Sequence, residues 1–530
     1  MPPFRAGSAL LMAVTVLAGC AGGPPETAVD PVVVATESGP VRGSAGPGFR
    51  VFRAIPYAAS AAGPLRWRAP ERPARWTAVR DATRPGPRCI QDTRVDPDYG
   101  LPTSEDCLSL TVWTPDAAAP GSPRPVMVWF HGGGFLNGSS DLYDARRLAT
   151  RGGIVVVTVN YRLGALGFLA HPALAVAGSG AGPGNSEPGN YGLADQQAAL
   201  RWVRDNIAGF GGDPGRVTIA GESAGAISVC DHLVAPESVG LFRAAIMQSG
   251  PCQAQADLAS AESVSLDYAA GVGCPEPLSA RRCLSAVPAD RLRDGPAYVR
   301  FGANLLSGPV TGTPRLPVSP ADAAARGTAA RVPVLIGTTT DEFTLFVALS
   351  YLRNRRLDPY PRLLADTFGS EAAAVAAHYP PELFGGNVGL AYATAVTDGV
   401  FACPVDAVAV GLARHARVYA FEFNDRSAPA PEPFREVPVP IGAAHGLELR
   451  YLFDMGGAPA LDAAQWQLAD QMVDSWSRFV ATGSPGSPGT AEWPPLGPDD
   501  PRRMSLQTGG PAVTADFAAR HRCDFWDSRG

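Results

Sequence analysis

The stretch Gly221-Glu222-Ser223-Ala224-Gly225 constrains this chain more than any other part of its sequence. The apolar residues 217–220 before it have the composition of a buried strand, and residues 224–233 after it suit a helix. A serine at the apex of so abrupt a turn is exposed to a reacting carbonyl, and the glycine two positions away on either side relieves the crowding. The pattern predicts a strand–turn–helix unit with Ser223 as a nucleophile, provided that the rest of the chain supplies a base.

Short apolar runs rich in β-branched residues alternate with helical patterns along the rest of the chain. Near-continuous apolar strands with helices between them are typical of a mostly parallel sheet that is covered on both faces. Residues 345–398 have a mostly helical pattern, and we expect them to form a cap over this sheet. We expect strands at residues 126–130, 154–160, 217–220, 244–248, 334–337 and 418–423, and helices at residues 193–207, 224–233 and 462–482.

The first residues are expected to be a targeting segment. Arg5 supplies a positive charge, and the apolar stretch after it is too short to span a membrane. It ends in Leu17-Ala18-Gly19-Cys20, which resembles the lipobox of bacterial lipoproteins, where the cysteine is lipidated. The alternative is an ordinary secretory signal cleaved near Ala18. We therefore expect an exported protein, held at the cell surface by a lipid on Cys20 or secreted, with a signal peptide at residues 1–19, a flexible tether at 20–31 and one domain at 32–526.

Eight cysteines remain when Cys20 is set aside, and the oxidising conditions outside the cytoplasm favour their pairing. Spacing predicts Cys89–Cys107 and Cys274–Cys283 as local loops, and Cys403–Cys523 as a long loop that holds the C-terminus. For Cys230 and Cys252 two alternatives stay open, a bond between them or two buried thiols.

A second glycine cluster, His131-Gly132-Gly133-Gly134-Phe135, directly follows the expected strand at residues 126–130. Successive glycines allow neighbouring backbone N–H groups to point the same way and allow a substrate to approach closely. Such N–H groups stabilise the negative oxygen of a tetrahedral acyl intermediate. In a chain that also carries an elbow serine, this cluster favours an oxyanion-binding loop over a glycine-rich turn without a ligand.

Together these features resemble the type-B carboxylesterases, a family of α/β-hydrolases that includes the cholinesterases. The resemblance runs from about Val32 to Trp526. It implies an α/β-hydrolase fold, with a mostly parallel central sheet flanked by helices and with helical cap insertions, and the activity of a carboxylic ester hydrolase. Besides the elbow, the matching stretches are Phe52-Arg53-Ala54-Ile55-Pro56-Tyr57-Ala58, Ser104-Glu105-Asp106-Cys107-Leu108-Ser109-Leu110, Asn160-Tyr161-Arg162-Leu163-Gly164, Gly189-Asn190-Tyr191-Gly192-Leu193-Ala194-Asp195-Gln196, Phe210-Gly211-Gly212-Asp213-Pro214 and Gln248-Ser249-Gly250.

The resemblance also implies the partners of Ser223, which follow it in this fold as an acid and then a histidine. Of the seven histidines, His445 lies in Gly442-Ala443-Ala444-His445-Gly446 and matches the His-Gly block of the family. Glu342 matches the acid, with Asp341 as the alternative, and Phe343 replaces the glycine that follows the acid in the family. The oxyanion donors implied are the N–H groups of Gly133, Gly134 and Ala224.

Further polar residues match supporting positions of the family. Glu222, Ser249 and Glu448 correspond to a buried polar network behind the triad, the alternative being ordinary polar packing in the core. Glu105 is expected to form a buried ion pair with a nearby arginine, and Arg53 is the candidate. That pair would be structural.

The predicted reaction has two acyl-transfer steps, with an acyl-enzyme on Ser223 that water then hydrolyses. No metal or organic cofactor is expected, and with a formal net charge of −6 and no basic cluster the chain is not expected to bind nucleic acid. The competing hypotheses are an inactive cholinesterase-like binding or adhesion protein and, among enzymes, an amidase, a lipase or a thioesterase. The loop between Cys89 and Cys107 contains Tyr99 but no tryptophan that would hold a quaternary ammonium, which argues against a cholinesterase.

Overall fold

The computed structural model describes residues 31–93, 102–116, 122–175, 188–302, 304–486, 492–497 and 499–529. The expected signal peptide, Cys20 and nearly all of the tether lie outside these residues, as does Tyr99.

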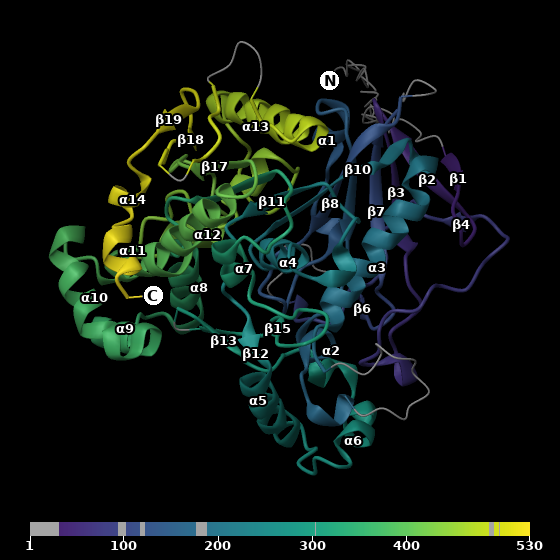
Figure 1. The fold of residues 1–530 in the computed structure, drawn as a ribbon, viewed down its shortest axis with the longest axis horizontal. Coiled ribbons are helices and arrows are strands. Elements are labelled where there is room, and N and C mark those ends of the chain that lie inside the picture. Colours follow the sequence, from purple (N-terminus) through teal and green to yellow (C-terminus); the bar gives the residue numbers. More distant parts are fainter. Residues whose placement is uncertain are drawn as a thin grey trace, which may run out of the picture.

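Within the described residues, thirteen strands form one large sheet (Figure 1). Their order is β1-β2-β3-β7-β9-β8-β10-β11-β16-β17-β18-β19, with β4 beside β2. The centre, from β9 through β8 to β18, is parallel. The strands at both margins pair antiparallel, except β4, which pairs with β2 in parallel. The bounds are β1 (Pro31–Ala35), β2 (Pro40–Gly46), β3 (Phe49–Pro56), β4 (Arg80–Asp81), β7 (Ser109–Pro115), β8 (Arg124–Phe130), β9 (Val155–Val159), β10 (Gly212–Glu222), β11 (Ala244–Gln248), β16 (Val334–Thr339), β17 (Val418–Phe423), β18 (Arg503–Leu506) and β19 (Ala512–Thr514).

Side chains of the central strands alternate between two hydrophobic cores, one on each face of the sheet. In β8, Val126, Val128 and Phe130 join the core that contains the helices α3 (Tyr191–Asn206) and α4 (Ala224–His232). Met127 and Trp129 join the core that contains α1 (Arg146–Thr150) and α13 (Ala463–Thr482). Both sets are fully buried, which explains why the strand reads as a continuous apolar run and shows no alternation of apolar and polar residues.

Helices cover both faces (Figure 1). The sequence predicted three of them closely, namely α3 (Tyr191–Asn206), α4 (Ala224–His232) and α13 (Ala463–Thr482), the last begun by a capping box of Asp462 and Gln465. The other helices are α1 (Arg146–Thr150), α2 (Gly164–Phe168), α5 (Leu258–Gly271), α6 (Ala280–Ala286), α7 (Pro320–Arg326), α12 (Cys403–Ala413), α14 (Phe517–Arg520) and α15 (Cys523–Asp527). Small two-stranded sheets join β5 (Arg88–Cys89) with β6 (Thr103–Ser104), β12 (Ala256–Asp257) with β15 (Val310–Thr311), and β13 (Val299–Phe301) with β14 (Asn304–Leu306).

The segment expected to be helical forms a separate lobe beside the sheet (Figure 1). It contains α8 (Thr344–Asn354), α9 (Tyr360–Phe368), α10 (Ala372–His378) and α11 (Val388–Val396), packed around a core of their own. A π-helical turn, Thr397–Ala402, then joins α11 directly to α12. The combined helix Val388–Ala413 is apolar and long enough to cross a membrane, but it is mostly buried inside the fold and serves as a core helix here.

Four disulfides are present in the described residues. They include the three pairs predicted from spacing, Cys89–Cys107, Cys274–Cys283 and Cys403–Cys523. Cys230 and Cys252, for which two alternatives were open, are bonded to each other. This disulfide content is typical of proteins that reside in an oxidising compartment outside the cytoplasm.

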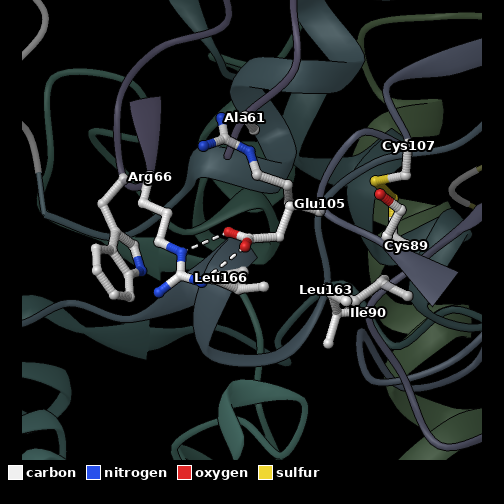
Figure 2. A pocket seen from close by; sticks show the side chains of 11 residues that line it. Ala61, Arg66, Cys89, Ile90, Glu105, Cys107, Leu163 and Leu166 are labelled. Atoms are coloured by element: carbon white, nitrogen blue, oxygen red, sulfur yellow. Dashed lines mark hydrogen bonds and ion pairs between the residues drawn. A yellow bond between two sulfur atoms is a disulfide. The ribbon is translucent and has the colours of Figure 1, made fainter. Parts of the chain in front are cut away.

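The ion-pair partner expected for Glu105 is wrong. Arg66, not Arg53, contacts Glu105, with Nε and one terminal nitrogen at 2.5 and 2.6 Å from the two carboxylate oxygens (Figure 2). Arg53 instead lies over the ring of Trp113, 5.1 Å from its centroid. Arg66 lies in an irregular segment whose position relative to the Cys89–Cys107 loop depends on the tertiary fold, so sequence proximity could not choose between the two arginines.

Candidate active site

Ser223 lies at a strained turn between β10 and α4. Its φ of +54° and ψ of −123° are unusual for a residue with a side chain, and its N–H donates to the carbonyl of Gln248 at 2.9 Å. Glycine is required on both sides of Ser223, because a side chain at either position would clash with neighbouring backbone atoms. A Cβ on Gly225 would lie 1.9 Å from the carbonyl oxygen of Phe130, and one on Gly221 would lie 2.4 Å from the carbonyl carbon of Gly225. The elbow thus packs directly against the end of β8.

Parallel pairing brings the other candidate residues to the same edge of the sheet. The glycine cluster follows β8, Ser223 follows β10, Glu342 follows β16, and His445 follows β17 at greater distance. Because β8, β10, β11, β16 and β17 pair in parallel, their carboxyl ends meet at one edge, where open α/β sheets bind their ligands.

His445 contacts Glu342 directly. Its Nδ1 lies 2.6 Å from Oε2 of Glu342, and the other carboxylate oxygen accepts the N–H of Thr339 at 2.8 Å. Glu342 is fully buried, and its backbone carbonyl also accepts the N–H of His445 at 3.3 Å. The carboxylate is therefore held from both sides and can fix the orientation of the imidazole.

Asp341, the alternative acid, faces away from His445. Its carboxylate accepts two hydrogen bonds from Arg426, at 2.9 and 3.0 Å, and one from the N–H of Ala443 at 3.0 Å. It ties the loop of Glu342 to the loop of His445 without touching the imidazole.

Phe343, which replaces the expected glycine, is accommodated without backbone strain. Its φ of −86° and ψ of −4° are ordinary for a residue with a side chain, and its ring packs against Phe346 and Tyr392. The ring also covers Gly302, where a Cβ would lie 2.2 Å from it. A glycine elsewhere in the chain thus makes room for the large side chain.

Glu222 lies on the other side of His445. Its Oε1 is 3.1 Å from Nε2 of the imidazole, so the ring lies between two buried carboxylates. Burial works to lower the pKa of His445, but the charges of Glu222 and Glu342 outweigh it and raise that pKa to about 9. Burial also raises the pKa of Glu222, to about 7, against the opposing charge of His445.

Glu448 and Ser249 are buried nearby. Oε1 of Glu448 accepts the side-chain N–H of Gln248 at 3.0 Å, and burial, together with the charges of Glu222 and Glu342, raises the pKa of Glu448 to about 8. The oxygen of Gln248 in turn accepts the indole N–H of Trp476 at 2.8 Å. Ser249 has a positive φ of +53°, and its N–H donates to Gly337 at 2.8 Å. Glu222 and Glu448 thus lie near the imidazole, whereas Ser249 contributes a backbone contact between neighbouring strands.

The glycine cluster forms a tight loop beside the elbow. Gly133 and Gly134 have positive φ values of +107° and +63°, and a Cβ on Gly132 would lie 3.1 Å from that of Ser223. His131 anchors the start of this loop, because its carbonyl accepts the hydroxyl of Tyr161 at 2.6 Å and its ring stacks on the tyrosine. Burial lowers the pKa of His131 to about 4, so it stays neutral.

A narrow apolar pocket adjoins Ser223. Its cavity measures about 10 Å³, roughly the room that one water needs. Its lining residues come from the glycine loop, the elbow and its helix, the segment after β11, and β13–β14 with the residue that follows. They are Gly134, Phe135, Ser223, Ala224, Ile227, Pro251, Ala254, Val299, Phe301, Leu306 and Ser307.

Two aromatic residues that contact His445 were missed by the sequence analysis. The rings of Phe346 and Phe401 have centroids 5.1 and 5.3 Å from the imidazole. Phe346 lies in α8, four residues after Glu342, and Phe401 lies in the π-helical turn. Phe346 could have been found from the sequence, because it lies one helical turn after Glu342. Nothing in the sequence around Phe401 indicates that it contacts His445.

The sheet order and the elbow between β10 and α4 define an α/β-hydrolase fold. Residues 30–526 match the sequence model of the Carboxylesterase family. The chain is 35% identical to fumonisin B1 esterase of Sphingopyxis macrogoltabida, over 91% of this chain and 87% of that protein, and 36% identical to para-nitrobenzyl esterase of Bacillus subtilis, over 87% and 92%. The solved structure of a thermophilic PNB esterase superposes with a TM-score of 0.77 at 31% identity, covering 93% of this chain and 99% of the other. The chain therefore belongs to the carboxylesterase family, and it is a carboxylic ester hydrolase.

Proposed function

We propose that this chain cleaves esters through an acyl-enzyme on Ser223, with His445 as the general base and Glu342 as the acid that orients it. The observation that carries the proposal is the 2.6 Å contact between His445 and Glu342, at the sheet edge where the elbow exposes Ser223. A buried carboxylate at Nδ1 fixes the tautomer, leaves Nε2 to exchange a proton and stabilises the imidazolium that forms during the reaction.

The proposed reaction begins when the Ser223 oxygen attacks the ester carbonyl and His445 accepts the hydroxyl proton. The carbonyl oxygen becomes negative and is stabilised by the N–H groups of Gly133, Gly134 and Ala224. The intermediate collapses when the C–O bond to the alcohol breaks and His445 gives its proton to the leaving oxygen. His445 then accepts a proton from a water molecule, whose oxygen attacks the acyl carbon. The bond from that carbon to the Ser223 oxygen breaks, the acid leaves, and His445 returns the proton to Ser223.

The buried carboxylates have a supporting role in this proposal. Glu222 lies 3.1 Å from Nε2 of His445 and stabilises the protonated imidazole. Glu448 accepts a hydrogen bond from the side chain of Gln248, and the backbone carbonyl of Gln248 accepts the N–H of Ser223. Glu448 thereby supports the elbow. Ser249 supports the site through its backbone N–H, which donates to Gly337.

The substrate is proposed to be a small-molecule ester. Para-nitrophenyl esters are suitable probes, because relatives of this chain are named for para-nitrobenzyl esters and because the nitrophenolate product is coloured. We expect wild-type protein to hydrolyse them and Ser223→Ala to lose at least a thousandfold in kcat. An unchanged rate in Ser223→Ala would contradict the mechanism, and no ester hydrolysis by folded wild type would favour the inactive binding protein. Parallel assays with anilides, long-chain triglycerides and thioesters decide between the esterase and an amidase, a lipase or a thioesterase.

We further propose that residues 1–19 are a lipoprotein signal and that Cys20 carries the lipid, with residues 20–31 as the tether of the domain. A single lipidated cysteine would hold the folded domain at a membrane surface. Mass spectrometry of the N-terminal peptide from a bacterial host tests this directly. Lipid on Cys20, lost in Cys20→Ala, is expected, whereas an unmodified N-terminus after Ala18 would show an ordinary secretory signal.

A further inference from the structure

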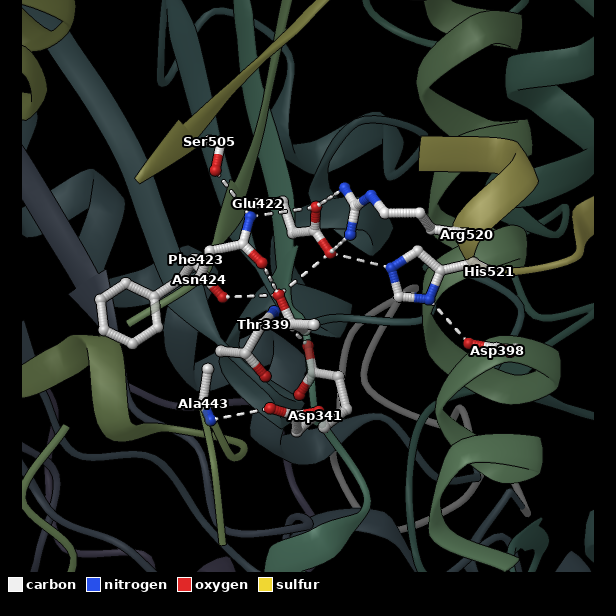
Figure 3. Close-up of polar contacts among 12 residues, drawn as sticks. Thr339, Asp341, Asp398, Glu422, Phe423, Asn424, Ala443, Ser505, Arg520 and His521 are labelled. Carbon is white, nitrogen blue, oxygen red and sulfur yellow. Dashed lines mark hydrogen bonds and ion pairs between the residues drawn. The ribbon is translucent and has the colours of Figure 1, made fainter. Parts of the chain in front are cut away.

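A second histidine, His521, is buried between two carboxylates outside the proposed triad. Its Nδ1 lies 2.6 Å from Oδ1 of Asp398, and its Nε2 lies 2.9 Å from Oε1 of Glu422 (Figure 3). The two ring nitrogens can each donate a hydrogen bond to a carboxylate only when both carry a proton, that is, when the imidazole is protonated. Burial works to lower the pKa of His521, but these two carboxylates outweigh it and raise that pKa to about 9. At neutral pH the side chain is a charged link between two segments.

The charges around this link are balanced by neighbours. Arg520 forms a bidentate ion pair with Glu422, one of its contacts being 3.0 Å, and also contacts Asp516 at 3.1 Å. The hydroxyl of Tyr379 donates to the second oxygen of Asp398 at 2.9 Å. The guanidinium of Arg522 lies over the ring of Tyr379, 4.5 Å from its centroid. Each carboxylate that faces His521 is thus held by a second partner.

One arm of the link leads to the loop that carries Glu342. Oε1 of Glu422, near the end of β17, lies 3.0 Å from the hydroxyl of Thr340, which also contacts Asn424. The N–H of Thr340 donates to the carbonyl of Phe423 at 3.0 Å. Thr340 precedes Glu342 by two residues. The position of Glu422 therefore bears on the position of the acid.

The other arm leads to the π-helical turn Thr397–Ala402, which carries Asp398. Thr397 accepts the N–H of Phe343 at 3.0 Å, and the ring of Phe401 packs against His445. π-Helical turns alter the direction of side chains within a helix and are frequent at functional sites. Here the turn lets Asp398 face His521 while Phe401 faces His445.

We propose that His521 is a positioning residue of the active site, which holds the Glu342 loop and the Phe401 turn in register through Glu422 and Asp398 and thereby orients His445. This inference rests on the proposed Ser223–His445–Glu342 mechanism. The Cys403–Cys523 bond already fastens the C-terminal segment to α12. Loss of the charged link therefore loosens the active-site loops without releasing the segment.

The test compares His521→Gln with His378→Gln in kcat, KM and the pH profile of kcat/KM for para-nitrophenyl acetate. His378 is a matched control, because it stacks on Phe525 of the same C-terminal segment, with centroids 4.1 Å apart. We expect His521→Gln to lower kcat at least tenfold with KM within twofold, because misaligned catalytic groups slow the chemical step. We also expect the ascending limb of the profile to move to lower pH by at least half a unit, because Glu342 then stabilises protonated His445 less. His378→Gln should change neither quantity.

A folded His521→Gln variant with kcat within twofold of wild type and an unmoved limb overturns the inference, even if its melting temperature falls. If this variant does not fold, Asp398→Asn, which removes the negative charge of one carboxylate partner of His521 with a side chain of equal size, decides by the same criteria. The low-field proton resonance of the His445–Glu342 hydrogen bond gives an independent reading and should shift in either variant. If wild type itself fails to hydrolyse the ester, the proposed function fails; if wild type is active and the variants match it, only this inference fails.

Discussion

Nε2 of His445 lies 3.1 Å from Oε1 of Glu222, although in the proposed reaction this same nitrogen exchanges protons with Ser223. The imidazole is therefore flanked by carboxylates at both nitrogens, which favours its protonated form and raises its pKa to about 9. A general base must be neutral before it can accept a proton. The Glu222 contact thus opposes the first step at low pH and supports the imidazolium once it has formed.

The first prediction concerns the pH dependence that this contact imposes. The kcat/KM of wild type should rise with pH as free His445 loses its proton, and Glu222→Gln should move this ascending limb to lower pH by about one unit, because one negative neighbour is removed. Glu448→Gln is the control, since the charge of Glu448 acts on His445 more weakly than that of Glu222. An ascending limb at the same pH in Glu222→Gln and wild type would contradict this account.

The second prediction concerns stability. The raised pKa of Glu448 means that this carboxyl keeps its proton in the folded state while the unfolded chain has already lost it. Its contribution to stability is complete below the unfolded pKa of about 4.5 and is lost as pH rises through about 8. The free energy of unfolding, measured with urea at pH 5, 6, 7 and 8, should therefore fall with rising pH in wild type. In Glu448→Gln it should fall less steeply, by about 1 kcal/mol per pH unit. Parallel declines would show that Glu448 ionises in the folded protein.

The third prediction concerns the pocket beside Ser223, which is narrow and lined mostly by apolar residues. Wild type should prefer short acyl groups, and Ile227→Ala should raise the ratio of kcat/KM for octanoate over acetate about tenfold, because the acyl chain gains room. Val229→Ala is the matched control, since Val229 is buried in the same helix but does not line the pocket. An equal octanoate-to-acetate ratio of kcat/KM in Ile227→Ala and Val229→Ala would show that the acyl group does not bind in this pocket.

The fourth prediction concerns the ion pair of Glu105 with Arg66 (Figure 2). Arg66→Met should lower the free energy of unfolding by about 3 kcal/mol, because it leaves a nearly buried carboxylate without its partner. Arg53→Met should cost about 1 kcal/mol, since it removes the contact with the Trp113 ring and a long hydrogen bond, 3.4 Å, to the carbonyl of Thr83. Denaturant unfolding measures both values. A larger loss of unfolding free energy in Arg53→Met than in Arg66→Met would instead support the pairing of Glu105 with Arg53.

The central sheet and the elbow were predictable because their signals are local. The strands before Ser223 and Glu342 are apolar runs that end within three residues of these side chains, and the glycines that relieve crowding at Ser223 lie two positions away. His445 follows its strand at greater distance and was located by the sequence motif around it. The antiparallel margin was not predicted. β2 contains glycines, a serine and an arginine, so it lacks the apolar pattern of a buried strand, and it is a strand because β1 and β3 pair with it.

The contacts that depend on distant segments were also beyond the sequence. Phe401 lies in a π-helical turn within a long, mostly apolar helix, and nothing in that local sequence indicates that its ring packs against His445. His521 meets Asp398 and Glu422 across 123 and 99 residues, and nothing near it in the chain marks it as different from a histidine in a solvated tail. Arg66 and Arg53 are equally basic and near in sequence, and only the fold distinguishes them.

The most direct test of the mechanism is covalent labelling of the folded protein with a fluorophosphonate probe, followed by mass spectrometry of the labelled peptide. We predict one adduct per chain, on Ser223, which is absent in Ser223→Ala and forms at least a hundredfold more slowly in His445→Gln, because the serine then lacks its base. Folded wild-type protein without an adduct, or with its adduct on another residue, would contradict the assignment of Ser223 as the nucleophile.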